Sequence, residues 1–171
     1  MRGRDPAPPL TQAPFHLYAE ERLYATRPTQ RLERFGGAPV PDCYQDFGPA
    51  LFPDVGEGGV MTYQPPALEA VPAHTSPAWR GQGGGLLHLT NWRIAFQGEA
   101  GDWLDFPFEA ISWSGCFMDG IGLFAANWSP MYFRTAYPEW LYAYFRFLAH
   151  RVLPQVRVTP ELEQKARARG Y

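Results

Sequence analysis

Residues 85–97 read Gly-Leu-Leu-His-Leu-Thr-Asn-Trp-Arg-Ile-Ala-Phe-Gln, and this stretch indicates the fold more directly than any other part of the chain. Apolar and polar side chains alternate on both sides of Thr90-Asn91, and a period of two is typical of half-buried β-strands. The pattern therefore predicts two strands that meet at Thr90-Asn91. We expect Ile94 and Phe96 to share one face of the second strand and to point into the core.

Further short strands are expected on both sides of this pair. Downstream they are Trp103–Phe108, Ala110–Met118, Ile121–Ala125 and Pro130–Arg134, and upstream Val60–Gln64 and Ala67–Val71. Asp119-Gly120 is a strong hairpin signal, because a type I′ turn needs positive φ at both central residues. Gly81–Gly85 is interpreted as a mobile connection. About seven strands at this short spacing predict an antiparallel sandwich or barrel.

An amphipathic helix is expected after the strands. Pro138 suits the first helical position, and Glu139 suits the positive end of the helix dipole. Apolar residues then recur at steps of three and four until Pro154 ends the helix. The predicted core residues are Ile94, Phe96, Phe108, Ile111, Phe133, Trp140 and Leu141. We expect Trp140→Ala to cost roughly 3–5 kcal/mol, as large core truncations do.

Taken in order, these segments resemble the GRAM-type, pleckstrin-homology-like (PH-like) domains over residues 58–153. Residues 85–97 are similar to the family pattern G-x-L-x-L-T-N-x-R-L-x-F, and Phe106–Ile111 is similar to its I-P-L-x-x-I strand. Asp119–Ile121, Tyr132–Arg134 and Pro138–Leu141 resemble the final hairpin and the start of the helix. The resemblance implies a mainly β (α+β) domain, a partly open seven-stranded antiparallel barrel closed by a C-terminal helix. It also implies binding of phosphoinositides, peptides or proteins rather than catalysis.

Residues 1–57 are interpreted as an irregular extension rich in proline and glycine, and residues 154–171 as a basic C-terminal helix. A short helix is expected within Phe15–Phe35. Residues 15–57 of the extension include eleven large apolar residues, which a disordered linker rarely does. We therefore expect it to wrap the domain and to bury these side chains on its outer surface or open end. They are Phe15, Leu17, Tyr18, Leu23, Tyr24, Leu32, Phe35, Tyr44, Phe47, Leu51 and Phe52.

The charge distribution bears on the class of partner. The 171 residues carry a net charge of −2, but residues 41–145 hold eleven acids and only three arginines. An acidic body does not attract phosphate backbones or anionic lipid. The two cysteines are 73 positions apart, and the longest apolar runs are far too short for a membrane span. A cytoplasmic protein without a transmembrane segment is expected.

Arg80, Trp92, Arg93 and Arg134 are the candidate ligand-binding residues. Arg93 occupies the basic strand position of the family pattern. The alternative is a structural arginine whose stem packs on an aromatic ring and whose head is paired to an acid. No residue is expected to bind a metal or a cofactor.

No catalytic residue is expected either. Ser114 lacks the glycine of a nucleophile elbow. Cys116 is interpreted as a buried, inert thiol, although His88 or His150 could in principle act as its base. Asp102 and Asp105 could bind a cation, but a solvated hairpin is the simpler interpretation.

The sequence thus predicts a non-catalytic binding or scaffold module for a protein or peptide partner, with homo-oligomerisation left open. One alternative is peripheral membrane or phosphoinositide binding, by analogy with the family. Another is weak nucleic-acid binding through the basic termini. An enzyme of unrecognised type is the last alternative, and no motif supports it.

Overall fold

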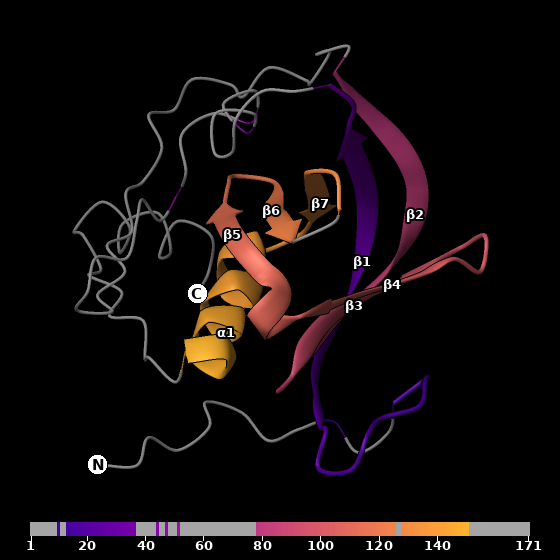
Figure 1. Cartoon of the computed structure of the whole chain (residues 1–171), viewed down its shortest axis with the longest axis vertical. Helices are drawn as coiled ribbons and strands as arrows, with labels where there is room; N and C mark the ends of the chain where they lie inside the picture. The colour runs from indigo at the N-terminus through magenta and orange to yellow at the C-terminus, as the bar shows by residue number, and fades with distance from the viewer. Residues whose placement is uncertain are drawn as a thin grey trace, which may run out of the picture.

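The computed structural model describes residues 10, 13–36, 44, 47, 51, 78–125 and 128–150. Within these residues, seven antiparallel strands form one sheet in the order β4-β3-β2-β1-β7-β6-β5. The elements are β1 Leu23–Arg34, β2 Trp79–Thr90, β3 Arg93–Gly98, β4 Trp103–Pro107, β5 Ile111–Cys116, β6 Gly120–Ala125, β7 Met131–Thr135 and helix α1 Pro138–His150. The sheet curls into a half-barrel, and α1 lies on its concave side (Figure 1). The mainly β fold and the helix after the strands are confirmed.

The helix expected within Phe15–Phe35 is wrong, because Leu23–Arg34 forms the strand β1. This strand lies between β2 and β7 and pairs with both. Pro28 seemed to interrupt the segment, but the ladder with β7 begins only at Thr29, so β1 has a free edge at the proline. Long-range pairing on two sides thus outweighs the local pattern.

The interpretation of Gly81–Gly85 as a mobile connection is also wrong, because these residues belong to β2 and pair with β1. At Gly85 the chain passes so close to β3 that a Cβ would lie 2.6 Å from the ring of Phe96. Glycine therefore serves close strand packing here rather than mobility.

The strands expected between residues 85 and 135 are confirmed. Their bounds differ by up to two residues, except that β2 begins at Trp79 rather than at Gly85. The helix begins at Pro138, as expected. The strand candidates Val60–Gln64 and Ala67–Val71 lie outside the described residues, as do Pro154 and the basic segment 154–171.

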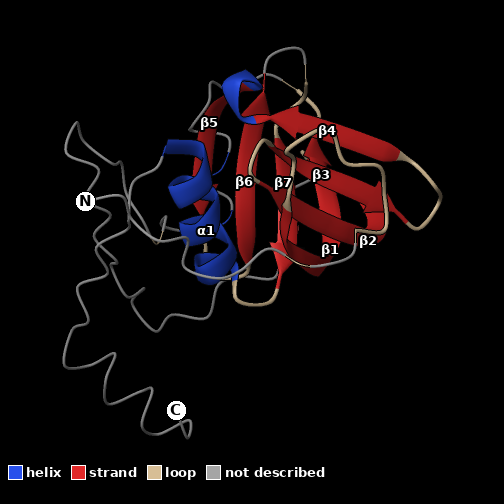
Figure 2. Cartoon of the chain, turned by 90° about the horizontal axis from the view of Figure 1, so that it is seen from below, coloured by secondary structure: helices blue, strands red, loops and turns tan. Residues whose placement is uncertain are grey.

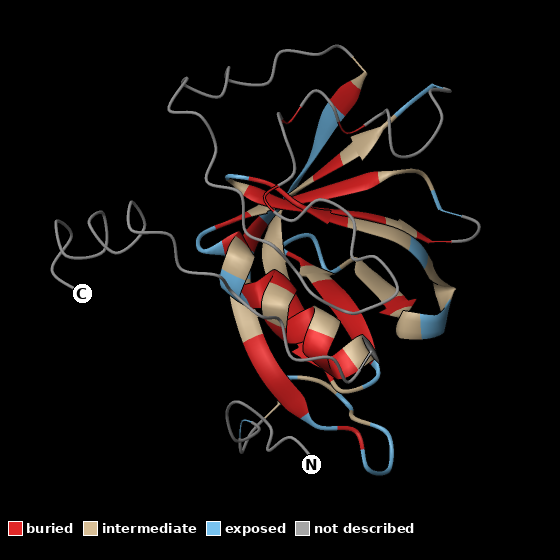
Figure 3. Ribbon diagram, turned by 90° about the vertical axis from the view of Figure 1, so that its left-hand side faces the viewer, coloured by how far each residue is buried: buried red, intermediate tan, exposed pale blue. Residues whose placement is uncertain are grey.

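The main core lies between the concave face of the sheet and α1, which packs beside β5 and β6 (Figure 2). Exposed residues lie at the turns between strands and along the first half of β2 (Figure 3). Four of the predicted core residues are fully buried, namely Ile94, Phe96, Phe133 and Leu141, and two pack partly against the cluster, namely Phe108 and Ile111.

The prediction for Trp140 is wrong, because this side chain is 40% exposed. Leu141, Phe145 and Leu148 follow the helical period and face the sheet, which turns Trp140 to the flank of α1. There its ring stacks on Tyr144 at 4.3 Å and lies under the guanidinium of Arg27 at 5.0 Å.

A second apolar cluster covers the opposite face of β5, β6 and β7. Because side chains alternate along a strand, Gly122 and Tyr132 point away from the face that carries Ile121 and Leu123. The ring of Phe47 stacks on Tyr132 at 3.5 Å. Other members of this cluster are Leu32, Tyr44, Trp79 and Phe117.

The expectation that residues 15–57 bury apolar side chains against the domain is confirmed for Tyr44, Phe47 and Leu51. Leu23, Tyr24 and Leu32 are buried too, but as part of β1. Tyr18 and Phe35 are exposed, contrary to the expectation, and Phe52 lies outside the described residues.

In the part of the chain that the structure describes, no helix has both the length and the apolar character needed to cross a membrane.

Candidate functional site

A pocket of about 590 Å³ opens at the end of the molecule where β2 turns into β3. The turn contributes Asn91, Trp92 and Arg93. The other lining residues are Tyr18 before β1, Pro107 at the end of β4, Phe108 and Glu109 after it, and Leu148 and Ala149 of α1. The pocket brings together two of the four sequence-predicted site residues, Trp92 and Arg93.

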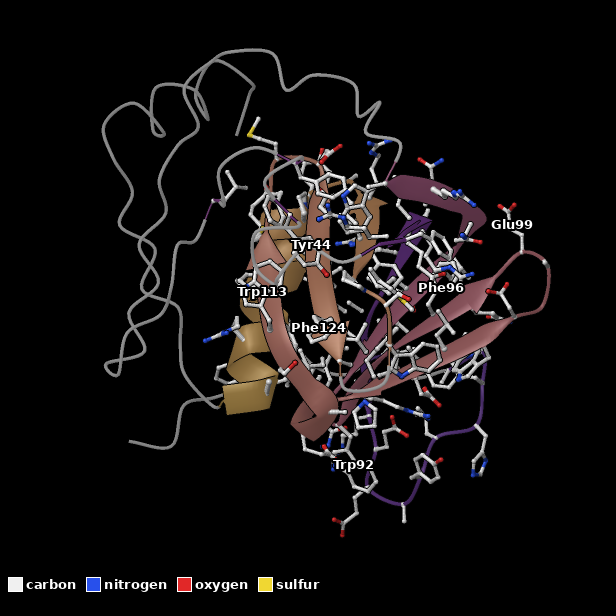
Figure 4. All side chains as sticks on the ribbon, turned by 45° about the horizontal axis from the view of Figure 1, so that its top comes forward. Tyr44, Trp92, Phe96, Glu99, Trp113 and Phe124 are labelled. Carbon is white, nitrogen blue, oxygen red and sulfur yellow. The ribbon has the colours of Figure 1, made fainter. Side chains whose placement is uncertain are left out.

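The turn that carries Trp92 is held rigidly. The buried Thr90 Oγ1 accepts hydrogen bonds from the N–H groups of Trp92 (3.1 Å) and Arg93 (3.0 Å). Asn91 Oδ1 accepts from the N–H of Arg22 at 2.7 Å, and its Nδ2 donates to the carbonyl of Glu20 at 3.2 Å. The backbone is therefore fixed while the Trp92 side chain remains 43% exposed at this end of the molecule (Figure 4).

Arg93 is buried, and its guanidinium is held by two carboxylates. Nε and Nη2 donate to the two oxygens of Glu21, at 2.7 and 3.1 Å, and Nη1 donates to Asp105 Oδ2 at 2.8 Å. Nη2 also donates to the carbonyl of His16, and the ring of Tyr18 lies 4.8 Å from the guanidinium carbon. These contacts confirm the alternative of a structural arginine with its head paired to acids.

Glu21 stays ionised in this cluster. Burial alone would raise the pKa of its carboxyl, but hydrogen bonds from Arg93 and from the N–H of Tyr18 outweigh burial and hold the pKa below its ordinary value. One arginine and two carboxylates leave the cluster with a charge of −1. Arg93 is thus committed to an internal network and is poorly placed to attract an anion.

The walls of the pocket are aromatic and aliphatic. The rings of Tyr18 and Trp92 lie 6.2 Å apart and nearly parallel, and Tyr18 is 56% exposed. Phe108, in the 3-10 turn η2 (Phe108–Ala110), packs against Phe145 at 5.5 Å. Leu148 and Ala149 close the side toward α1. Exposed aromatic rings beside an apolar depression are typical of sites that bind another molecule.

The other two predicted site residues lie elsewhere. Arg80, on β2, is exposed and lies over the ring of Phe35 at 5.1 Å. Arg134, on β7, donates to Asp119 Oδ2 at 2.8 Å. The structure does not bring either of them to the pocket.

Sequence reasoning missed Tyr18 and Glu21, which are more than 70 positions away from Arg93. Nothing in their local pattern places them beside the β2–β3 turn. Asn91 was not named as a site residue either, although Thr90-Asn91 was already interpreted as the turn between two strands.

Two of the residues considered for catalysis, Cys116 and His88, lie on opposite faces of the sheet. Cys116 is buried in the main core, and burial raises the pKa of its thiol, so the nucleophilic thiolate is disfavoured. His88 lies on the other face of the sheet, because its neighbours Leu87 and Leu89 face the core. The Oγ of Ser114 lies 3.2 Å from the hydroxyl of Tyr142. The side chain of His150 lies outside the described residues.

The pair Asp102 and Asp105 is divided between two arginines. Asp102 pairs with Arg31 at 2.8 Å, and Asp105 pairs with Arg93 at the same distance. Across the described ranges, no group of three or more His, Cys, Asp or Glu side chains is suited to hold a metal ion.

No protein-family model, no curated protein and no solved structure matches the chain.

Proposed function

We propose that this protein is a non-catalytic, PH-like binding module of GRAM type, and that a protein or peptide partner docks in the pocket beside Trp92. The fold part of the proposal is supported by the curled antiparallel sheet with a helix after its last strand, which is the layout that the resemblance implies. The functional part is argued from the pocket itself.

The observation that carries the proposal is the contrast between a fixed backbone and exposed rings. Thr90 and Asn91 pin the turn, whereas Trp92 and Tyr18 keep large ring surfaces open to solvent. Binding to pre-arranged aromatic anchors costs little conformational entropy, and tryptophan and tyrosine are enriched among the residues that dominate interface energies. A rigid aromatic pocket is therefore better suited to binding a partner than to stabilising the fold alone.

The pairing of three described arginines favours this function over anionic lipid binding. Arg93, Arg31 and Arg134 are paired to carboxylates, and Arg80 lies over the ring of Phe35. Phosphate groups bind where several cationic side chains converge without acidic partners. The nucleic-acid alternative rests on the basic termini, of which residues 1–9 and 151–171 lie outside the described residues.

A photo-cross-linker at position 92 tests the proposal. Trp92→p-benzoylphenylalanine should capture a partner in the protein's own cells, and the same change at Trp140, which is similarly exposed on the flank of α1, should not. The purified partner should then bind the Trp92→Ala variant at least tenfold more weakly, and the Trp140→Ala variant as it binds the unmodified protein. Capture from both positions, or affinity that survives Trp92→Ala, would reject the pocket as the docking site.

Liposomes provide the test of the lipid alternative. We expect no co-sedimentation with vesicles that contain phosphatidylserine or phosphoinositides, at low or at physiological salt. Salt-sensitive binding that the variant Arg80→Gln abolishes would favour the lipid function instead.

A further inference from the structure

The charges around the pocket beside Trp92 point to the chemistry of its ligand. Among the described residues that line the pocket, two side chains carry a full charge, Arg93 and Glu109. The charge of Arg93 is overcompensated by Glu21 and Asp105. Glu109 is exposed and takes part in none of the ion pairs of the described chain. The described lining of the pocket therefore presents negative charge to an incoming group.

Two neighbouring cations of the described residues, Arg22 and Arg146, lie outside the lining of the pocket. Arg22 stands beside Glu20, and both are tied to Asn91 through their backbone atoms. Arg146 of α1 lies near the hydroxyl of Tyr142, which bonds to Ser114 on β5.

The aromatic rings add a second preference for positive charge. A guanidinium or ammonium group is attracted to the face of a tryptophan, tyrosine or phenylalanine ring. The protein already uses this interaction inside the site, because Arg93 lies over the ring of Tyr18 at 4.8 Å. Trp92 and Tyr18 are nearly parallel and exposed, and Phe108 adds a third ring to the lining.

From these observations we infer that the ligand of this pocket is a peptide segment with an arginine or lysine side chain next to an apolar residue. The cationic group lies against the Trp92 and Tyr18 rings within reach of the Glu109 carboxylate. The neighbouring apolar residue contacts the aliphatic side formed by Pro107, Leu148 and Ala149. This inference rests on the proposed function and specifies the class of partner.

Display selection with a random peptide library on the full chain tests the inference. The selected peptides should be enriched in arginine or lysine beside Leu, Ile, Val or Met. Replacing the selected arginine by citrulline, which keeps its shape but removes its charge, should weaken binding about tenfold in calorimetry. A selected lysine is replaced by norleucine, and the same loss is expected.

Two variants with matched controls locate the interaction. Trp92→Ala should abolish measurable binding of the selected peptides, whereas Trp140→Ala should leave it unchanged. Glu109→Gln should weaken binding a few-fold at 50 mM salt and less at 500 mM, because salt screens an exposed pair. Glu99→Gln, an exposed carboxylate in the turn between β3 and β4, should have no effect.

The outcomes separate the inference from the proposed function. Peptides that need Trp92 but bind equally well with citrulline or norleucine would overturn the inference and leave the docking site intact. A selection that returns no binder, or binders indifferent to Trp92→Ala, would overturn both.

Discussion

Two stretches of chain cover the face of the sheet that points away from α1, and they do so with different chemistry. Residues 13–21, here called the polar cover, lie over β2, β3 and β4 and are held by the ion pair between Arg93 and Glu21. Tyr44 and Phe47, here called the aromatic cover, lie over β5, β6 and β7 and are held by ring stacking. Figure 4 shows Tyr44 and Trp92 at different ends of the molecule.

The comparison shows why only one of the covers provides a candidate site. The aromatic cover buries both of its rings almost completely. In the polar cover the ion pair carries the attachment, so Tyr18 is not needed to seal the sheet and remains exposed beside Trp92. Attachment through an ion pair thus leaves the Tyr18 ring exposed for a partner, whereas attachment through apolar contacts buries the rings of Tyr44 and Phe47.

The largest effect on stability is expected in the aromatic cover. Phe47 is fully buried and stacked on Tyr132, so Phe47→Ala should lower the free energy of unfolding by roughly 3–5 kcal/mol. Urea denaturation measures this change. A loss below about 1 kcal/mol would mean that Phe47 does not seal the sheet.

Removing the ion pair that holds the polar cover should lower the free energy of unfolding slightly less than Phe47→Ala does. Glu21→Gln leaves the buried Arg93 with Asp105 as its remaining charged partner, and we expect a loss of about 3 kcal/mol. The control is Asp119→Asn, which removes the half-buried pair with Arg134 but keeps an oxygen that can accept the hydrogen bond from Tyr132. This change should cost less than about 1 kcal/mol. Equal losses for the two variants would contradict the structural role of the buried network.

The two covers should also differ in their response to acid. Burial lowers the pKa of His88, which lies under Phe15 of the polar cover, from the ordinary 6.5. The unfolded chain therefore takes up a proton first, and stability falls as the pH drops below about 6.5. The pKa of Glu21 is also lowered, from 4.5, so a second loss follows as the pH drops through that region.

Melting temperatures between pH 7.5 and 3.5 test this dependence. Glu21→Gln should remove the part of the slope below about pH 4.5. Phe47→Ala should shift the whole curve without changing its shape. A curve that is flat between pH 7 and 5 would contradict the assignment for His88.

The smallest effect is expected at the flank of α1. Because Trp140 is 40% exposed, Trp140→Ala should cost only about 1 kcal/mol, from the stacking with Tyr144 and Arg27. Chemical denaturation measures the loss. A loss of 3 kcal/mol or more would show that Trp140 is a core residue and contradict its exposed position on α1.

The sequence was sufficient for elements whose signal is local. The alternation of residues 85–97 and the start of the helix at Pro138 depend on neighbouring residues. The hairpin between β5 and β6 is present, but the type I′ turn expected at Asp119-Gly120 is wrong, because neither residue has positive φ and Gly120 belongs to β6. The sequence thus located this turn but not its type. It was insufficient for β1, whose strand conformation depends on pairing with β2 and β7 far along the chain. The same limit explains the site: Trp92 and Arg93 were found within one motif, whereas Tyr18 and Glu21 reach them only through the tertiary fold.

The central claim is that the ion pair between Arg93 and Glu21 holds the polar cover, and with it one wall of the pocket. Amide hydrogen exchange tests it directly, because the N–H groups of Tyr18, Glu21 and Arg22 all donate hydrogen bonds within or from this cover. In Glu21→Gln these amides should lose protection, while the amide of Leu51, which donates to the carbonyl of Cys116, should keep it. Unchanged protection of residues 18–22 in that variant would contradict the account.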